Sequence, residues 1–289
     1  MPDSGDRSDP DPTLTWIEGT PRLACDVFGG GPPVMFLHGI GGGRVNWATQ
    51  TAAFPGFTTI AWDARGYGAS DDYDGDLAFT DFADDVVRVL DQLNIDRAHL
   101  VGLSMGARIL MDLFTRHPER VATLTLCDCF YGFRSSLTPE KQAEFIELRE
   151  RPLRSGKTLE DLAPALVESL LGRTADDTAR DALTRSITAL HVESYLKTLR
   201  ATVSFERSDD LATFDVPVQL IFGSDDRLTP PSIGEELVTL MPNARLHVIE
   251  GAGHLSNIEQ PVEFNRVLGH FLDGHRHAAA WITDQARDA

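Results

Sequence analysis

Short apolar runs recur along the chain, and longer stretches of mixed polarity separate them. Several of these runs lack the alternation of polar and apolar residues that marks a half-exposed strand. They therefore predict parallel strands that helices cover on both faces. Examples are the runs at 33–38, 57–63, 97–103, 121–127 and 217–223.

The stretches between the runs have helical spacing. In residues 80–94, Phe82, Val86, Val89 and Leu90 fall on one face of a helix. The stretch that follows Ser104 is also helical in pattern and stops before a proline. Strand, crossover helix and strand repeat up to about residue 128, which predicts an α/β fold with a doubly wound, mostly parallel sheet.

The alternation of strands and helices stops between residues 130 and 210, where helical periods continue without a convincing strand. The pattern predicts helices near 138–150, 158–171, 176–190 and 192–204. Because strands resume at Val216, we expect a helical lid inserted after the sixth strand, at 130–210. The sheet core then comprises 14–129 and 211–289. Residues 1–13, rich in Asp and Pro, predict a disordered tail.

The charge of the chain narrows the possible partners. Its formal net charge of −18 would repel nucleic acid and anionic membrane surfaces, and no basic patch offsets it. The acidic start is unlike a secretory signal, and no apolar stretch has the length of a membrane span. Cys25, Cys127 and Cys129 are expected to be buried free thiols. We therefore expect a cytoplasmic protein that binds neither nucleic acid nor membranes. The sequence pattern indicates no particular oligomeric state.

The pentapeptide at 102–106 reads GLSMG, which fits the Gly-x-Ser-x-Gly pattern of a nucleophile elbow. An apolar strand precedes Ser104 and an amphipathic helix follows it. Such a turn leaves little room for side chains two residues to either side of the serine, which explains the two glycines. The alternative, a glycine-flanked helix cap without catalytic meaning, does not account for this context. We expect Ser104 to be the nucleophile.

A serine nucleophile needs a general base within hydrogen-bond reach. Among nine histidines, His254 lies in the glycine-rich loop GAGHLSN directly after the last predicted strand. His247 lies within that strand and is expected to be a packed residue. His191, in the predicted lid, is the alternative with a plausible role in contacting substrate. We expect His254 to be the base.

The acid that orients the base is expected in the loop after strand 217–223, which gives the chain order Ser, Asp, His. Asp225 and Asp226 compete there, and we favour Asp226 because it lies deeper in the loop. Asp128, at the end of the strand after the nucleophile helix, is a third candidate.

The negative oxygen formed by attack on a carbonyl requires fixed hydrogen-bond donors. The backbone N–H groups of Ile40, in the glycine-rich loop at 38–43, and of Met105 are the expected oxyanion hole. A dinucleotide-binding loop is the rival interpretation of 39–44, but its last glycine is missing. We further expect His38, Gly39, Tyr131 and His191 to contact the substrate, and we expect no cofactor and no metal.

Five motifs in order together resemble the α/β-hydrolase family from about residue 14 to 273. They are the HG and following glycines at 38–43, DARGYGAS at 63–70, GLSMG at 102–106, GSDDRLTP at 223–230 and GAGHLSNIEQP at 251–261. The triad acid of the family lies in a Gly-x-x-Asp-x-x-x-Pro pattern. Gly223, Asp226 and Pro230 fit it, so the resemblance supports Asp226 over Asp225.

Within this family, GLSMG and HLSNIEQP are similar to the branch of 3-oxoadipate enol-lactonases, cofactor-free serine perhydrolases and small carboxylesterases. Serine at 104 excludes the branches that use a carboxylate nucleophile. The chain departs from many relatives at Ala107, where they carry a second glycine, which leaves the chemistry unaffected.

Three functions remain open at this point. The first is a serine esterase or lactonase that uses the catalytic triad and the oxyanion hole. The second is hydrolysis of the carbon–carbon bond of a vinylogous diketone, such as a ring-cleavage product. The third is a small-molecule receptor without catalytic activity. Arg134, Arg207 and Arg227 are candidates to receive a substrate carboxylate, although pairing with the many surface acids is the commoner role.

Overall fold

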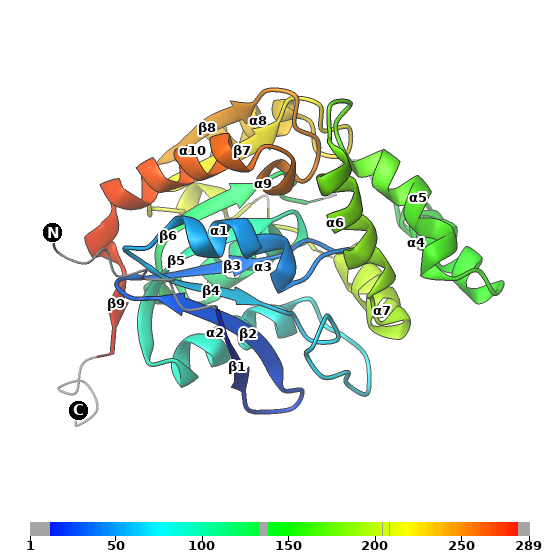
Figure 1. Cartoon of the computed structure of the whole chain (residues 1–289), viewed down its shortest axis with the longest axis horizontal. Helices are drawn as coiled ribbons and strands as arrows, with labels where there is room; N and C mark the ends of the chain where they lie inside the picture. Colours follow the sequence, from blue (N-terminus) through cyan, green and yellow to red (C-terminus); the bar gives the residue numbers. More distant parts are fainter. Residues whose placement is uncertain (1–11, 133–137, 204, 208, 283–289) are drawn as a thin grey trace, which may run out of the picture.

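The computed structural model describes residues 12–132, 138–203, 205–207 and 209–282. Its centre is a twisted sheet with the strand order β1-β2-β4-β3-β5-β6-β7-β8 (Figure 1). Neighbours from β4 to β8 pair in parallel, whereas β1 and β2 pair antiparallel at one edge. The strands are β1 (Thr13–Ile17), β2 (Leu23–Gly29), β3 (Pro33–Leu37), β4 (Thr58–Trp62), β5 (Ile95–Leu103), β6 (Val121–Cys127), β7 (Val218–Gly223) and β8 (Ala244–Ile249).

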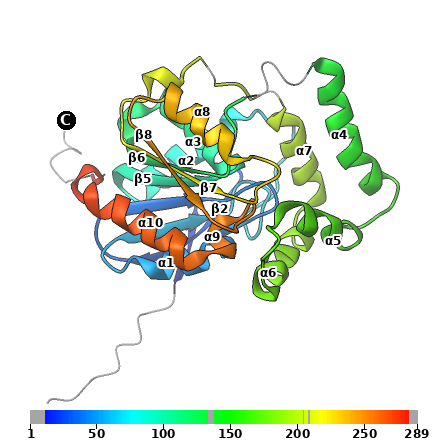
Figure 2. The ribbon, with the colours of Figure 1, turned by 90° about the horizontal axis from the view of Figure 1, so that it is seen from above.

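Helices cover both faces of the sheet (Figures 1 and 2). Side chains alternate between the faces of a strand, so neighbouring residues of β3 enter different cores. Met35 and Leu37 join the cluster under α2, α3 and α8, whereas Val34 and Phe36 join the cluster under α1 and α10. The helices are α1 (Ala48–Ala53), α2 (Thr80–Gln92), α3 (Met105–Arg116), α8 (Pro231–Leu240), α9 (Ser256–Glu259) and α10 (Pro261–Gly274).

The predicted α/β class with a doubly wound, mostly parallel sheet is confirmed, and the reason is visible in burial. Every residue of β3, β4, β6 and β7 is buried, as a strand covered on both faces requires. The sequence pattern did not predict β1 or the two-residue strand β9 (Ala280–Trp281), which pairs with the start of β5. Both are partly exposed, so the continuous apolar signal is missing from them.

In the described part of the chain between β6 and β7, four α-helices follow one another. They are α4 (Pro139–Arg154), α5 (Leu159–Leu170), α6 (Asp177–Thr188) and α7 (Val192–Thr202). Thr158 and Asp176 cap α5 and α6 through hydrogen bonds from backbone N–H groups. Both views place the four helices together beside the sheet (Figures 1 and 2). That this segment works as a lid remains a prediction, and most of the predicted tail lies outside the described residues.

Candidate active site

A sharp turn between β5 and α3 holds Ser104 with a backbone φ of +53°. This left-handed conformation is uncommon for a residue with a side chain and is typical of the nucleophile elbow. A Cβ on Gly102 would lie 2.4 Å from the carbonyl carbon of Gly106, and one on Gly106 would lie 2.2 Å from the carbonyl oxygen of Leu37. The close backbone approaches therefore require glycine on both sides of the serine.

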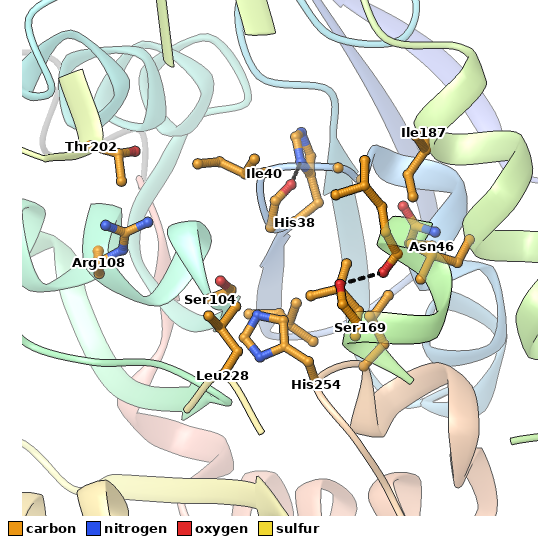
Figure 3. Close-up of a pocket in the computed structure, with 18 of the residues that line it drawn as sticks. His38, Ile40, Asn46, Ser104, Arg108, Ser169, Ile187, Thr202, Leu228 and His254 are labelled. Carbon is orange, nitrogen blue, oxygen red and sulfur yellow. Dashed lines mark hydrogen bonds between the residues drawn. The ribbon is translucent and has the colours of Figure 1, made fainter. Parts of the chain in front are cut away.

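His254 lies in the loop between β8 and α9 and is 4% exposed. Its Nδ1 is 2.8 Å from Oδ2 of Asp226. When Nδ1–H donates to that carboxylate, Nε2 is left as the acceptor nitrogen of the ring. Figure 3 shows the His254 ring beside the Ser104 side chain. An imidazole in this tautomer beside a serine hydroxyl is the arrangement that a histidine base requires.

The Asp226 carboxylate is buried in the loop between β7 and α8. Its Oδ1 accepts the N–H groups of Leu228 (2.8 Å) and Thr229 (3.0 Å), and its Oδ2 accepts the Thr229 hydroxyl (2.6 Å). Burial opposes ionisation of Asp226, but the charge of His254 and these hydrogen bonds outweigh it and lower the pKa of Asp226. The residue is held as an anion that faces the imidazole.

The same pair sets the pKa of His254, the expected base. Burial disfavours the charged form of His254, but the charge and the hydrogen bond of Asp226 outweigh burial. The pKa of His254 therefore lies above its ordinary value, and an imidazolium formed during a reaction would be stabilised.

The two other candidate acids have different partners. Asp225 pairs with Arg173, whose Nε lies 3.0 Å from its Oδ2. Asp128 accepts the N–H of Gly223 (2.8 Å) and the hydroxyl of Ser256 (2.5 Å). Asp128 thereby links the end of β7 to the start of α9. Its pKa is raised to about 8, mainly by burial and also by the charge of Asp226.

The loop after β3 lies close to Ser104. A Cβ on Gly39 would lie 3.3 Å from Cβ of Ser104, so this loop runs close against the serine. His38 braces the loop, because its Nδ1 donates to the carbonyl of Gly39 (2.8 Å) while its Nε2 accepts the N–H of Ala64 (3.1 Å). Burial lowers the pKa of His38, which keeps its ring neutral in this role. Ile40 follows directly, and Met105 opens α3, where the first N–H groups have no helical acceptor.

Ser104 and His254 both line a cavity of about 630 Å³, the size of a small-molecule site. Its wall is mostly apolar and comes from the β3 loop, the nucleophile elbow, the His254 loop and helices α4 to α7. Figure 3 shows Ser104 and His254 between Arg108 on one side and Asn46 and Ile187 on the other. The described residues that line this cavity include arginines but no aspartate and no glutamate.

Residues 32–261 match the family described as the alpha/beta hydrolase fold. The chain belongs to the α/β-hydrolase family. One relative of this hydrolase is 32% identical over 272 residues, which cover 86% of the chain and 89% of the relative. It is named 2-hydroxy-6-oxononadienedioate/2-hydroxy-6-oxononatrienedioate hydrolase and comes from Burkholderia vietnamiensis.

Two solved structures are also similar. The enol-lactonase from Burkholderia xenovorans LB400 is 25% identical with a TM-score of 0.78, and the match covers 90% of this chain and all of the other, at 100%. A thermophilic esterase from Thermogutta terrifontis shares the fold with a TM-score of 0.84 at 24% identity, covering 91% and 99% of the two chains. The resemblance of this hydrolase to the branch with enol-lactonases and small esterases is confirmed.

Of the four residues expected to contact substrate, His38 and Gly39 line the cavity, whereas Tyr131 and His191 do not. The Tyr131 hydroxyl donates to Glu236 (2.9 Å) on α8. Nδ1 of His191 lies 2.9 Å from Asp72. Each side chain is engaged by an acid away from the cavity, so the structure offers no support for these two predictions.

The three arginines that were candidates to receive a substrate carboxylate differ in where they lie and in what their guanidinium groups contact. Arg207 pairs with Asp112, and Arg134 lies outside the described residues. Arg227 lines the cavity, but its guanidinium already donates to the backbone carbonyl of Leu171 (3.0 Å). The sequence analysis missed Arg108, which lines the cavity beside Ser104. The available signal was one basic residue in the apolar stretch MGARILMDLF, one turn after the serine.

The α5–α6 connection is fastened to the His254 loop. The N–H of His254 donates to the carbonyl of Leu170 (2.8 Å), and Glu259 accepts the N–H groups of both Gly172 (2.7 Å) and Gly253 (3.0 Å). A Cβ on Gly253 would lie 2.2 Å from the Gly172 nitrogen, so the two segments touch backbone to backbone. These contacts hold the α5–α6 connection, in the predicted lid, against the loop that carries His254.

Two further observations concern the described ranges only. They contain no helix that has both the length and the apolar character to cross a bilayer. They also contain no group of three or more His, Cys, Asp or Glu side chains arranged to hold a metal ion. Cys25, Cys127 and Cys129 are buried and free of disulfides, as predicted.

Proposed function

We propose that this hydrolase cleaves an ester or lactone of a small organic substrate through an acyl-enzyme on Ser104. The observation that carries the proposal is the buried hydrogen bond between Asp226 and His254, which leaves Nε2 of the ring for the serine. The geometry fits the triad logic of a nucleophile, a base and an orienting anion. The apolar cavity around Ser104 fits a small organic acyl group.

The reaction follows from these positions. Nε2 of His254 takes the proton of Ser104 as the hydroxyl oxygen attacks the substrate carbonyl. The N–H groups of Ile40 and Met105 stabilise the oxyanion, a contribution of about 3 kcal/mol for each well-aligned donor. The protonated His254 then gives its proton to the departing alcohol oxygen, which a lactone retains on the same molecule.

Water completes the cycle. His254 takes a proton from water, the hydroxide attacks the acyl-enzyme, and the resulting tetrahedral intermediate expels Ser104. The proton on His254 returns to the serine, and a carboxylic acid leaves. Asp226 remains ionised throughout and holds the imidazole in the productive tautomer.

A second candidate uses the same triad to break a carbon–carbon bond. It is favoured by the relative that is 32% identical and named for a 2-hydroxy-6-oxo dienedioate. The keto form of such a compound is a vinylogous diketone, in which the group that departs from the attacked carbonyl is a stabilised carbanion. A panel of p-nitrophenyl esters of varied chain length, lactones and one such diketone separates the two candidates by their kcat/KM values.

Labelling with a fluorophosphonate tests the assignment of the nucleophile. The wild-type protein is expected to be labelled and Ser104→Ala is not. Ser169 also lines the cavity, but its hydroxyl donates to the carbonyl of Leu166 (2.7 Å), so Ser169→Ala is the matched control that keeps labelling. Labelling that persists in Ser104→Ala would show that another residue reacts. No labelling and no turnover, with a ligand-dependent rise in Tm, would instead favour the receptor.

A further inference from the structure

Arg108 lies one helical turn after Ser104 on α3, which places both residues on the same side of the helix. The residue is 2% exposed, yet it lines the cavity that contains Ser104 and His254. A guanidinium that is buried beside a nucleophile loses its hydration, and this loss must be compensated by a partner.

Within the part of the chain that the structure describes, aromatic rings but no acid contact this guanidinium. Its Cζ lies 4.4 Å from the ring centre of Phe130, 5.7 Å from that of Phe79 and 5.8 Å from that of Phe205. Rings attract a cation through their faces, whereas the N–H donors of arginine lie in the guanidinium plane. Among the described residues, Nε and Nη1 of Arg108 have no hydrogen-bond partner. The rings therefore leave these donors unsatisfied.

The carboxylate one turn further along α3 is already engaged. Asp112 pairs with Arg207, and its other oxygen lies 3.6 Å from Nη1 of Arg116. Burial lowers the pKa of Arg108 to about 10, so the side chain still carries its charge at neutral pH. A full positive charge thus faces the cavity, and the described residues provide no internal counter-ion for it.

A second unpaired donor lies close by. The hydroxyl of Thr202, at the end of α7, is buried, has no hydrogen-bond partner among the residues that the structure describes, and also lines the cavity. Its carbonyl accepts the N–H of Phe205 (3.2 Å), one of the rings around Arg108. Figure 3 shows Thr202 and Arg108 on the same side of the site, away from Asn46.

The charge of the cavity is opposite to that of the chain. The whole protein carries −18, whereas the described residues of the cavity wall include Arg108, Arg149 and Arg227 and no acid. The positive charges of such a wall attract an anionic ligand, and no acid in the described wall opposes that attraction. A carboxylate matches one guanidinium in charge and presents two acceptor oxygens to its donors.

We infer that Arg108 and Thr202 form a subsite for a carboxylate of the substrate, so that this hydrolase acts on esters or lactones that carry a free acid. The inference rests on the proposed function, because the subsite lies one turn from the serine to which that function assigns the chemistry. Occupation of the subsite would replace the water lost by Arg108 and hold the scissile carbonyl near Ser104.

Two pairs of substrates test the subsite on either side of the scissile bond. The first pair is mono-p-nitrophenyl adipate and its methyl ester, in which the acid lies on the acyl side. The second pair is 4-acetoxyphenylacetate and its methyl ester, in which the acid lies on the departing phenol. Within each pair the acid is remote from the reacting carbonyl, so release of the phenol compares binding with little change in intrinsic reactivity.

Wild-type protein is expected to prefer the free acid in one of the pairs by about 10- to 100-fold in kcat/KM, the range of a hydrogen bond to a charged group. Arg108→Met is expected to lose this preference. Thr202→Val is expected to reduce it several-fold. Arg116→Met removes the same charge from the same helix outside the cavity and is expected to keep it. Equal rates within both pairs for the wild type, or a preference that survives in Arg108→Met, would overturn the inference.

The stability of the variant gives an independent readout. Removing an unpaired buried charge is expected to raise Tm in Arg108→Met, whereas a purely structural arginine would lower it. Should Arg108→Met not fold, Arg108→Lys keeps the charge without the planar fork and is expected to retain only part of the preference.

Failure of the subsite and failure of the proposed function give different results. Hydrolysis of the neutral esters without preference for the acids rejects the subsite alone. No labelling of Ser104 and no turnover rejects the proposed function. In that case calorimetric titration with 4-hydroxyphenylacetate and its neutral amide still decides the subsite. Selective binding of the acid that Arg108→Met abolishes supports it, and equal binding of the two compounds overturns it.

Discussion

Replacement of Asp226 by asparagine separates its charge from its shape. Oδ1 of Asp226 receives two backbone N–H groups, those of Leu228 and Thr229, so the amide oxygen of an asparagine is expected to occupy that position. The amide NH₂ then faces Nδ1 of His254, where a carboxylate oxygen now lies 2.8 Å away. A donor at that position requires Nδ1 to accept, which puts the ring proton on Nε2 and prevents it from accepting the proton of Ser104.

The expected loss of kcat in Asp226→Asn is up to ~10⁴-fold, by analogy with other triads. At about 1.4 kcal/mol for each factor of ten, this corresponds to about 5 kcal/mol of the activation barrier. Burst kinetics with p-nitrophenyl acetate measure acylation and deacylation separately, and both steps should slow because His254 serves in each. Folding is checked by the thermal melt.

Asp225→Asn and Asp128→Asn are the controls. Asp225 forms a solvent-exposed ion pair with Arg173, so its neutralisation is expected to leave kcat nearly unchanged. Burial and the charge of Asp226 raise the pKa of Asp128, so a neutral amide is expected to change the charge less at this position than at Asp226. A collapse of turnover in Asp128→Asn, with Asp226→Asn close to wild type, would refute the reasoning and move the acid to the end of β6.

Three other outcomes follow from the same contacts. The kcat/KM of a neutral ester should fall on acidification from above pH ~6.5, because a protonated His254 cannot accept a proton and its pKa is raised by Asp226; a profile that is flat to pH 5 would exclude a histidine base. Gly106→Ala should lower stability by about 2 kcal/mol, measured by thermal melting, because its Cβ would meet the Leu37 carbonyl at 2.2 Å. A higher Tm would mean that the helix propensity of alanine outweighs that contact. Glu259→Gln should cost about 1–3 kcal/mol, since one of the three partly buried N–H groups that Glu259 accepts would face an amide NH₂, and unchanged urea unfolding would count against this.

Much of the fold could be predicted because it depends on patterns that are local in the chain. The buried strand β3 is apolar throughout and β7 is apolar except for Gln219, since helices cover both strands on both faces. The elbow at Ser104 is also a local signal, because its two glycines are required by the backbone of the turn itself. Chain order and the Gly-x-x-Asp-x-x-x-Pro match then favour the loops after β7 and β8 for the expected acid and base, although Asp128 after β6 also fits the order. Exposed edge strands such as β1 lack this continuous pattern and were missed.

Other features depend on contacts between distant parts of the chain. Asp225 and Asp226 are adjacent and chemically identical, and only the folded loop turns one toward His254 and the other toward Arg173. The surroundings of Arg108 also depend on the tertiary structure. The sequence shows that Arg108 is a basic residue in an apolar helix. The rings that surround it in the described structure, where no acid pairs with it, come from distant segments of the chain. Sequence determined which backbone conformations the chain adopts, because those depend on neighbouring residues. The tertiary structure decided which charges are paired, because a counter-ion is defined by distance in space and not by separation along the chain.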